Sequence, residues 1–333
     1  MIAGKVQYYV YVTTESGTTL NVTNAVTNLG WEENEKEIST RVSFTLVNAW
    51  YKKKKLSKIV KIGQLVTIKA NWGAGSKKII QAFIKEAEAS SSKSAESYKI
   101  TAYDCLFAMQ KSQDNVFYKK GKKTKALITS IFGKWGIKLA SYSGPNVKHA
   151  KIVYKNKSIS DIILGILDEA EEKGGKKAIP RAEGLSVSIV GLGKNKEIYV
   201  LDGTNCIEAD YKVSIIDLVT KVVIMASDKK SEQSKVEATM TKNTKYGVLQ
   251  KIEMKAKSDS MSDAKKAAKK ILDDNSKPKR TRTIQCPDVP PVRKGDKVLV
   301  DAGSIEGEFL VKSIQHNADS GKMSMVVQKY SEA

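Results

Sequence analysis

The sequence has few of the residues that metal sites and disulfide scaffolds require. Its 333 residues include three cysteines and two histidines. Cys105, Cys206 and Cys286 lie far apart and form no C-x-x-C pair, which predicts reduced thiols in a cytoplasmic fold rather than a metal site. His149 and His316 belong to no metal-ligand spacing such as H-E-x-x-H. We therefore expect neither a metal nor a cofactor.

Long hydrophobic runs are also missing. A membrane-spanning helix needs roughly 20 predominantly apolar residues, and the nearest run, Ile162 to Leu167, is short and contains Gly165. Residues 5–13 alternate like a β-strand, where a secretory signal would have an apolar core. We expect no membrane insertion, and synthesis in the cytoplasm without a signal peptide.

Catalytic motifs are absent as well. The sequence contains no G-x-S-x-G elbow, the turn that holds the nucleophile of many serine hydrolases. Asp202 with Asp210, or Glu169 with Glu171, could be imagined as an acid and base pair, but such a pair depends on a spatial separation that a sequence does not provide. Glu169 and Glu171 are more simply the solvated end of a helix. We expect no catalytic residues and no enzymatic activity.

Two glycine clusters resemble nucleotide-binding loops without having their spacing. The segment GAGSKK at 73–78 misses the G-x-x-x-x-G-K-[ST] pattern, and GLGKN at 191–195 lacks a third glycine and precedes a strand. Both clusters lie between predicted strands, the second between those at 185–190 and 197–201. Hairpin turns with positive φ explain the glycines there. We expect no cofactor-binding residues at either cluster.

The charge is strongly of one sign. Lysine and arginine number 57 against 36 aspartates and glutamates, a formal net charge of +21. Such a balance indicates contact with a polyanion: nucleic acid, an anionic envelope polymer or an acidic partner. Only five of the basic residues are arginine, the side chain that base-specific readout favours. We expect a solvated basic surface or a positive docking face, with short lysine runs at 52–55 and 119–125.

Alternating strands dominate both ends of the sequence. Apolar residues recur at every second position in 6–12, 38–46 and 66–72, and further strands are predicted at 79–87 and 98–103. Strands resume at the other end, and the predicted ones are 221–226, 236–240, 249–256, 281–286, 297–301, 307–314 and 323–328. Short alternating strands separated by glycine and serine are typical of small barrels or sandwiches.

Helical spacing is confined to the middle of the sequence and to one later segment. Asp104 is a plausible cap for a short helix through Met109, and Thr124 begins a second helix that ends at Gly136. Ser158 begins a third, with Asp161 as a variant of the capping box. A fourth is predicted near 262–274, capped near Ser262.

These patterns predict a β-rich α+β protein with two small β-barrel domains and an α+β insertion between them. The expected domains are an N-terminal barrel at 1–103, the insertion at 104–213, and a C-terminal barrel at 214–333 that carries the later helix. Tyr8, Tyr9 and Tyr11 share the first strand. Tyrosines on an exposed strand face suit a subunit interface, which we favour over base stacking of the kind seen in OB-folds.

Several short phrases occur in an order that resembles the XkdQ/YqbQ-like family of phage tail hub proteins. The phrases are ITAYDCL at 100–106, KSISDII at 157–163, SIIDLV at 214–219, KYGVLQ at 245–250, KGDKV at 294–298 and GEFLV at 307–311. Each phrase is short, and their number and order carry the resemblance.

The resemblance implies a structural hub of a contractile phage tail, a prophage tail or a phage-tail-like bacteriocin. Such hubs form trimers whose two barrels per subunit make a pseudo-sixfold ring that joins the tail tube to the central spike. The implied partners are further copies of the chain, the tube protein, the spike protein and other baseplate proteins, with DNA only if it passes through the ring. The implied location is the baseplate of an assembled particle, after synthesis in the bacterial cytoplasm.

Two other classes of function remain open at this point. A basic β-barrel that binds nucleic acid would use the +21 charge, and steep salt dependence of its polyanion affinity would identify it. An envelope-degrading enzyme is the third class, although no catalytic motif or additional domain for it is visible in the sequence.

Overall fold

The structure is a computed structural model that describes residues 6–73, 75–91, 96–226, 235–255 and 260–332. Strands account for 51% of the residues and helices for 19%, so the expected β-rich class is confirmed. The chain divides into two compact units: Met1–Ala209 with Thr283–Ala333 forms the first, and Asp210–Arg282 forms the second. The three expected domains, 1–103, 104–213 and 214–333, were based on where predicted strands and helices alternate along the sequence. This division stays a prediction.

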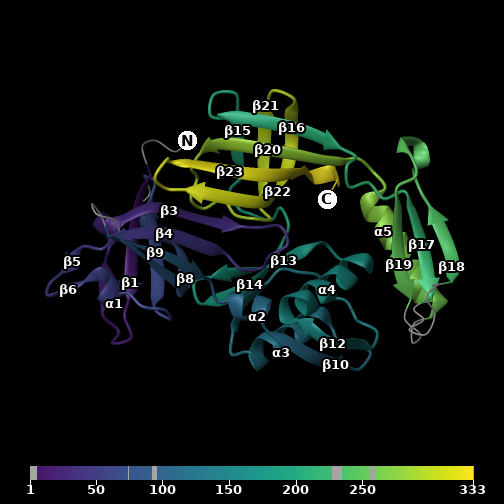
Figure 1. The fold of residues 1–333 in the computed structure, drawn as a ribbon, viewed down its shortest axis with the longest axis horizontal. Helices are drawn as coiled ribbons and strands as arrows, with labels where there is room; N and C mark the ends of the chain where they lie inside the picture. Colours follow the sequence, from purple (N-terminus) through teal and green to yellow (C-terminus); the bar gives the residue numbers. More distant parts are fainter. Residues whose placement is uncertain (1–5, 74, 92–95, 227–234, 256–259, 333) are drawn as a thin grey trace. The chain divides into compact units, whose positions relative to one another are not determined.

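The N-terminal part of the first unit is an antiparallel sheet. Its strands are β1 (Gln7–Thr13), β2 (Thr19–Asn21), β3 (Val26–Glu33), β4 (Arg41–Val47), β7 (Leu65–Asn71), β8 (Ser76–Ser91) and β9 (Glu96–Tyr103). They are ordered β3-β4-β9-β8-β7-β1-β2 (Figure 1). Every second side chain is buried, as Val10 and Val12 are in β1, because successive side chains of a strand point to opposite faces.

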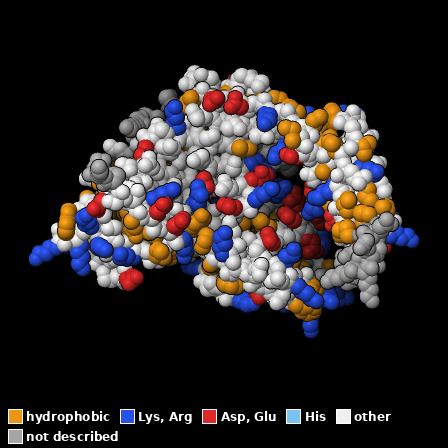
Figure 2. All heavy atoms as spheres, in the orientation of Figure 1, with side chains coloured by type: hydrophobic (Ala, Val, Ile, Leu, Met, Phe, Trp, Pro, Cys, Tyr) orange, Lys and Arg blue, Asp and Glu red, His pale blue; other side chains and the backbone are white. Residues whose placement is uncertain are grey.

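Short elements project from this sheet. They are the turn η1 (Thr23–Ala25), the hairpin of β5 (Trp50–Tyr51) and β6 (Lys54–Lys55), and the single turn α1 (Leu56–Ile59). The β5–β6 hairpin turns at Lys52, whose φ is 54°. Figure 2 shows lysine and hydrophobic side chains together at the left, over this hairpin, and other basic side chains spread over the face that it draws.

The middle of the first unit combines helices with two small sheets. The helices are α2 (Phe107–Lys111), α3 (Thr124–Lys134) and α4 (Ile159–Glu172), and the strands are β10 (Gln113–Tyr118), β11 (Lys138–Tyr142), β12 (Ile152–Ser158), β13 (Ala178–Glu183) and β14 (Ser186–Gly191). The sheets are β10-β12 and β11-β14-β13. Leu127, Ile131, Ile162 and Ile166 pack in their shared core, and α3 and α4 confirm the two helices predicted from Thr124 and from Ser158.

The C-terminal part of the first unit is a second group of strands. They are β15 (Tyr199–Asp202), β16 (Glu208–Ser214), β20 (Lys279–Pro287), β21 (Lys297–Ala302), β22 (Ile305–Asn317) and β23 (Lys322–Lys329), followed by η3 (Tyr330–Glu332). The order is β16-β20-β23-β22, with β21 pairing β22 and β15 pairing β21. The boundary between the two units falls inside β16 and β20, so that residues 210–214 and 279–282 of these strands belong to the second unit.

One pairing joins the two groups of strands into a single 13-stranded sheet. The end of β22 pairs antiparallel with β3, in register from Ile314 opposite Glu33 to Asn317 opposite Gly30. At Gly30 a Cβ atom would lie 2.8 Å from the carbonyl oxygen of His316. Glycine is therefore required for this close approach, which places β3, near the start of the chain, beside β22, near its end.

The second unit is one helix on three strands. It contains β17 (Lys221–Ala226), β18 (Val236–Thr241), η2 (Thr244–Tyr246), β19 (Gln250–Lys255) and α5 (Met261–Asn275). β17 is central, antiparallel to β18 and parallel to β19. Val222 and Ile224 pack against Ala264, Ala268 and Leu272 of the helix.

Helix starts were predicted with mixed success. Ser158 caps α4, where its hydroxyl accepts a bond from the Asp161 amide at 3.0 Å, as the sequence predicts. The cap of α5 is Ser260 rather than Ser262, because the Ser260 hydroxyl is the one that accepts the Asp263 amide. Helix α2 begins three residues after Asp104, and Asp104 has a different role, described below.

The strand and turn predictions were incomplete. The sequence did not predict β3, nor the strands β10, β11, β12, β13 and β16, several of which are rich in polar residues that hide the alternation. The cluster GLGKN was expected to be a hairpin turn, but it connects β14 to β15, which belong to different sheets. The first glycine cluster does lie in a β7–β8 hairpin, with positive φ at Gly73 and Gly75 and with Ala74 outside the described residues. No described helix is long and apolar enough to cross a membrane.

Candidate functional site

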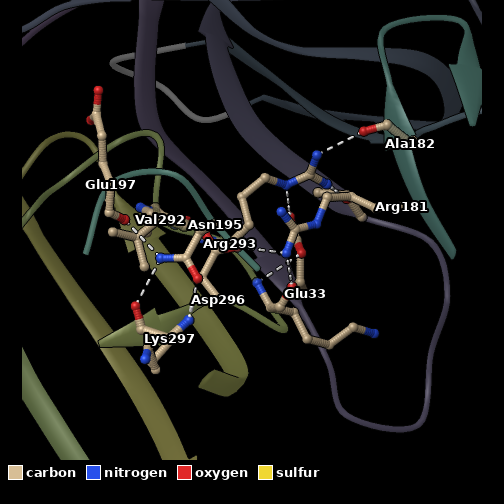
Figure 3. A network of polar contacts seen from close by, with 12 residues as sticks. Glu33, Arg181, Ala182, Asn195, Glu197, Val292, Arg293, Asp296 and Lys297 are labelled. Carbon is tan, nitrogen blue, oxygen red and sulfur yellow. Dashed lines mark hydrogen bonds and ion pairs between the residues drawn. The ribbon is translucent and has the colours of Figure 1, made fainter. Parts of the chain in front are cut away.

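Charged side chains from three parts of the first unit meet in its interior. Glu33 ends β3, Arg181 lies in β13, and Arg293 and Asp296 lie in the turn before β21. Figure 3 shows the two guanidinium groups converging on Glu33. Glu33 and Asp296 are buried, each with an exposed fraction of 6%. These residues, which are far apart in sequence, therefore form a buried ionic junction.

Arg293 is bound on all sides. Its Nε lies 2.6 Å from Glu33 Oε1, its Nη1 donates to the Ala182 carbonyl at 2.7 Å, and its Nη2 donates to the Thr40 hydroxyl at 3.3 Å. The other oxygen of Glu33 accepts the backbone amide of Lys294 at 3.1 Å. One arginine thus connects β3, the start of β4 and β13, which is the geometry that the rigid guanidinium fork favours.

Arg181 forms the second half of the junction. Its Nη2 lies 2.8 Å from Asp296 Oδ1 and also donates to the Lys294 carbonyl. Asp296 Oδ2 accepts the Arg293 amide at 2.9 Å, which holds the turn closed. Lys294 extends the network, because its ammonium group donates to the carbonyls of Asn34 and Glu37.

The charges of the junction depend on one another. Burial alone would raise the pKa of Glu33, but the neighbouring charges of Arg293, Arg181 and Lys294 outweigh it and hold that pKa below its ordinary value. Burial alone would lower the pKa of Arg293, and the carboxylate of Glu33 reverses that effect. The pKa of Lys294 is lowered, chiefly by burial. Removing one partner would leave an uncompensated charge in the interior.

Asp104 lies beside this junction and organises two chain turns. Its Oδ2 accepts the Thr40 amide at 2.8 Å, and its Oδ1 accepts the Leu106 amide at 2.9 Å. Burial raises the pKa of Asp104, and the two backbone bonds oppose that rise only in part. Asp104 was predicted as a helix cap, and it instead joins the start of β4 to the turn before α2.

A second buried network joins the same two groups of strands. His316 of β22 places Nδ1 2.6 Å from Asp288 Oδ1 and Nε2 3.1 Å from the Val292 carbonyl. Tyr8 of β1 donates its hydroxyl to the other oxygen of Asp288. The His316 ring stacks on Trp31 of β3, with centroids 4.5 Å apart. Tyr8 therefore points into this network and is not part of the exposed strand face that we expected.

Neither network has room for a substrate. The space lined by Glu33, Arg181 and Arg293 does not admit a water-sized molecule, and the polar groups of the second network bind one another. A larger hollow of about 800 Å³ follows β15 between Trp72 and Pro287. The two carboxylates on its wall are engaged locally, Glu197 by the Tyr199 hydroxyl and Asp202 by Thr204. What the two networks do is hold distant segments together.

The remaining residues that the sequence analysis considered have structural partners. His149 is buried between Glu169, 3.0 Å from its Nδ1, and the Thr124 hydroxyl, 2.9 Å from its Nε2. Glu169 also pairs with Lys173, and Glu171 with Lys177. These pairs use the two carboxylates of α4 that had been weighed as acid and base.

Two of the three cysteines lie near members of these networks, because the charges of Asp104 and Asp288 add to the effect of burial on the pKa values of Cys105 and Cys286. Cys105, Cys206 and Cys286 are free thiols, and burial raises the pKa of Cys105 and of Cys286 to about 12 in each case. Among the described residues, no cluster of three or more histidine, cysteine or carboxylate side chains could hold a metal ion. Asp210 belongs to the second unit and Asp202 to the first.

Sequence reasoning missed both networks, although one signal for the first was present. The chain has only five arginines, and two of them, Arg181 and Arg293, are the cations of the buried junction. Arginine is the basic side chain best suited to buried ion pairs, so each of the five arginines was a candidate for an interior position, although Arg41 lies at the surface. Nothing in the spacing indicates that Tyr8, Asp288 and His316 meet.

Comparisons with known proteins agree over most of the chain. Residues 29–328 match the family described as YQBQ-like. The phage-like element PBSX protein XkdQ of Bacillus subtilis is 25% identical over 236 residues, which are 68% of this chain and 71% of XkdQ.

Two solved structures share the fold. The 43 kDa tail protein of prophage MuSo2 from Shewanella oneidensis has a TM-score of 0.67 and 12% identity, over 97% of this chain and 98% of that one. The c3393 protein of E. coli is described as a type VI secretion system component with structural similarity to the T4 bacteriophage tail proteins gp27 and gp5. It has a TM-score of 0.55 and 10% identity, over 99% of this chain and 78% of that one.

Proposed function

Because the chain belongs to the YQBQ-like family, we propose that it is a structural hub subunit of a phage-tail or phage-tail-like baseplate. The observation that carries this proposal is the extent of the family match, which runs from within β3 into β23. It therefore includes most strands of both groups, all but β1 and β2, and the helical part between them. XkdQ belongs to a phage-like element, and the MuSo2 protein is a prophage tail protein.

In this role the two groups of strands act as two barrels of one subunit. Three subunits then form a ring with pseudo-sixfold symmetry, which matches a sixfold tail tube on one side and a threefold spike on the other. The buried junction supports such a role, because it ties β3, β13 and the β21 turn together. A ring that transmits load between tube and spike needs subunits whose two barrels do not separate.

The proposed partners are further copies of the chain, the tube protein, the spike protein and other baseplate proteins. The c3393 likeness supports the spike, since that protein is compared with gp27 and gp5 of T4. DNA is a partner only if it passes through the ring. We place the subunit in the baseplate of the assembled particle, as a structural component without catalytic turnover.

Reconstitution tests this function directly. The chain is expressed together with the tube and spike proteins of its own particle, and the product is imaged by electron microscopy. A ring with threefold symmetry, in contact with tube and spike, is the expected result. Failure of the chain to enter any assembly with either protein would overturn the proposal, and cell-wall zymography of the purified chain would reveal a hydrolase.

A nucleic-acid-binding function remains the second candidate because of the +21 charge. Double-stranded DNA binding through lysines would weaken steeply as salt rises, because each phosphate contact releases counterions. Affinity for DNA measured between about 50 and 200 mM salt would fall by a factor of about 10³ or more if six or more phosphates are contacted. A hub would show weak binding that depends little on the presence of any one lysine run.

A further inference from the structure

Three carboxylates lie in a row across one face of the C-terminal strands. Asp202 of β15 is opposite Asp301 of β21, and Asp301 is opposite Glu306 of β22. Like charges directly opposite one another destabilise a sheet. None of the three forms an ion pair with any residue that the structure describes; Asp202 instead accepts bonds from the Thr204 amide and hydroxyl. Figure 2 shows carboxylates exposed at the top, over β21.

An apolar row lies beside the carboxylates. Val200 of β15 is opposite Leu299 of β21, and their exposed fractions are 49% and 39%. Ile198, just before β15, is 48% exposed. Side chains two positions apart share a face of a strand, so Val200 and Asp202 lie on one face together. Glu308, opposite Leu299, pairs with Lys297 at 2.8 Å. We refer to this surface as the acidic face.

The β5–β6 hairpin has the opposite charge and also exposes apolar side chains. Trp50 is 68% exposed, the most exposed aromatic side chain among the described residues, and Val47 just before it is 50% exposed. Lys52, Lys53 and Lys54 are exposed and make no ion pair within the described chain. Lys55 is different, because it is paired with Glu96 at 2.6 Å. We refer to residues 47–54 as the basic hairpin.

The two surfaces complement each other, but they are separate within one chain. Figure 1 shows the β5–β6 hairpin at the left end of the first unit and β15 and β21 at its top. A contact between them therefore needs two copies. Contact of one patch with a different patch on the next copy is heterologous, and it closes into a ring when the rotation between copies permits.

We propose that the basic hairpin of one copy docks on the acidic face of the next, with Trp50 against Val200 and Leu299. Lysines 52–54 then neutralise the carboxylate row that each copy leaves unpaired. Trp is the residue type most enriched at the energetic centres of interfaces, and complementary charge fixes orientation and excludes the wrong partner. This inference rests on the proposed function, since it names the contact that builds the ring.

Charge reversal in both surfaces tests this contact. One variant carries Lys52→Glu, Lys53→Glu and Lys54→Glu; a second carries Asp202→Lys, Asp301→Lys and Glu306→Lys; a third carries all six changes. Self-association of the full chain is measured by light scattering over protein concentration at low salt. We expect each triple variant to weaken self-association by about tenfold or more. The variant with all six changes should recover most of the lost affinity.

A matched control separates the contact from net charge. The variant with Lys119→Glu, Lys120→Glu and Lys122→Glu changes the charge equally on another exposed run of the same unit, and it should associate like the wild type. Trp50→Ala should weaken association while circular dichroism and thermal unfolding stay unchanged, because the side chain is exposed.

Two results would overturn the inference. In the first, the reversal variants associate like the control, so copies meet through other surfaces. In the second, the wild-type chain stays monomeric at every concentration, so this contact does not form between copies. The hub function would survive either result if the chain still entered the ring with tube and spike, and it would fall only if that reconstitution failed.

Discussion

The two compact units of the chain hold their structures in different ways. The first unit has three apolar cores. It is also tied by buried polar side chains between segments far apart in sequence, as in the 260-residue separation of Glu33 and Arg293. The second unit has a small apolar core in which α5 packs on β17. Its ion pair between Lys242 and Asp273 lies at the surface.

The difference shows what each kind of contact specifies. Apolar packing of a helix on a neighbouring sheet depends on volume and pattern, and it tolerates many residue combinations. A buried ion pair between distant strands is formed only when those strands are in one register, so it discriminates against other arrangements. In the first unit, whose two groups of strands must be held together, we infer that the junction provides this discrimination.

The largest expected effect comes from breaking the junction of the first unit. Glu33→Gln removes the charge that balances Arg293, and loss of one partner of a buried pair costs about 3–5 kcal/mol. The free energy of unfolding of the first unit should fall by that amount in denaturant titrations. Hydrogen exchange in α5 should not change, because the second unit has its own core.

The neighbouring residue is a matched control for that variant. Glu32 is also on β3 and pairs with Arg41 at 3.0 Å, but at the surface, so Glu32→Gln should cost less than about 1 kcal/mol. If Glu32→Gln and Glu33→Gln lowered the free energy of unfolding equally, the junction would be no stronger than a surface ion pair.

The second unit should respond to a cavity instead. Leu272 of α5 is buried at 3% exposure against the strands, and Leu→Ala changes in cores cost about 2–5 kcal/mol. Hydrogen exchange should show loss of protection in α5 and β17 while β3 and β22 stay protected. Lys265→Ala on the exposed side of α5 is the control. If Leu272→Ala also reduced protection from hydrogen exchange in the first unit, the two units would not have independent cores.

At acidic pH the wild type and Glu33→Gln should differ less in their free energy of unfolding. The folded pKa of Glu33 lies below its ordinary value of 4.5, so its stabilisation is complete above about pH 4.5 and is lost as pH falls through the folded pKa. The difference in free energy of unfolding should be constant from pH 5 to pH 7 and should shrink below that. The raised pKa of Asp104 acts in the opposite direction, but it is common to both proteins. A difference that does not change with pH would mean that Glu33 does not titrate on unfolding.

The smallest effects should come from the helix caps, one in each unit. Ser158→Ala removes the cap of α4 and Ser260→Ala that of α5, and loss of a serine cap costs about 1 kcal/mol. Each cost should appear only in the unit that contains the helix, and Ser→Asp at the same positions should restore most of it. If Ser262→Ala destabilised α5 more than Ser260→Ala, the structural assignment of that cap would be wrong.

The sequence-based predictions succeeded where a structure depends on residues close together in the chain, and they failed where it depends on distant ones. The helix starts at Thr124 and Ser158 and the three strands of the second unit depend on neighbours within a few residues, and the sequence predicted them closely. β3 was missed because its inward residues Leu29, Trp31 and Glu33 include a charge, which breaks the apolar alternation. That charge is buried only because Arg293, 260 positions later, is there to pair with it.

The candidate site itself was out of reach of sequence patterns. Asp104 was noticed as a cap and His316 as an isolated histidine, and both proved to be buried members of polar networks. Their partners come from β1, β4 and the proline-rich segment before β21, and no spacing in the chain encodes which of these segments meet. The charged runs were easier to find, and three lysines of the run at 52–55, residues 52–54, belong to the basic hairpin.

The sequence by itself determined the β-rich class, the main helices, the excess of positive charge and the resemblance to a tail-hub family. These follow from periodicity, composition and short phrases, which are properties of residues near one another in the chain. Only the tertiary structure decided that Gly30 lets β22 pair with β3, that two rare arginines close on Glu33, and that Asp202, Asp301 and Glu306 form one unpaired row. The reason is physical: each of these depends on strand register between segments up to 287 residues apart, and register is set by the packing of the whole unit.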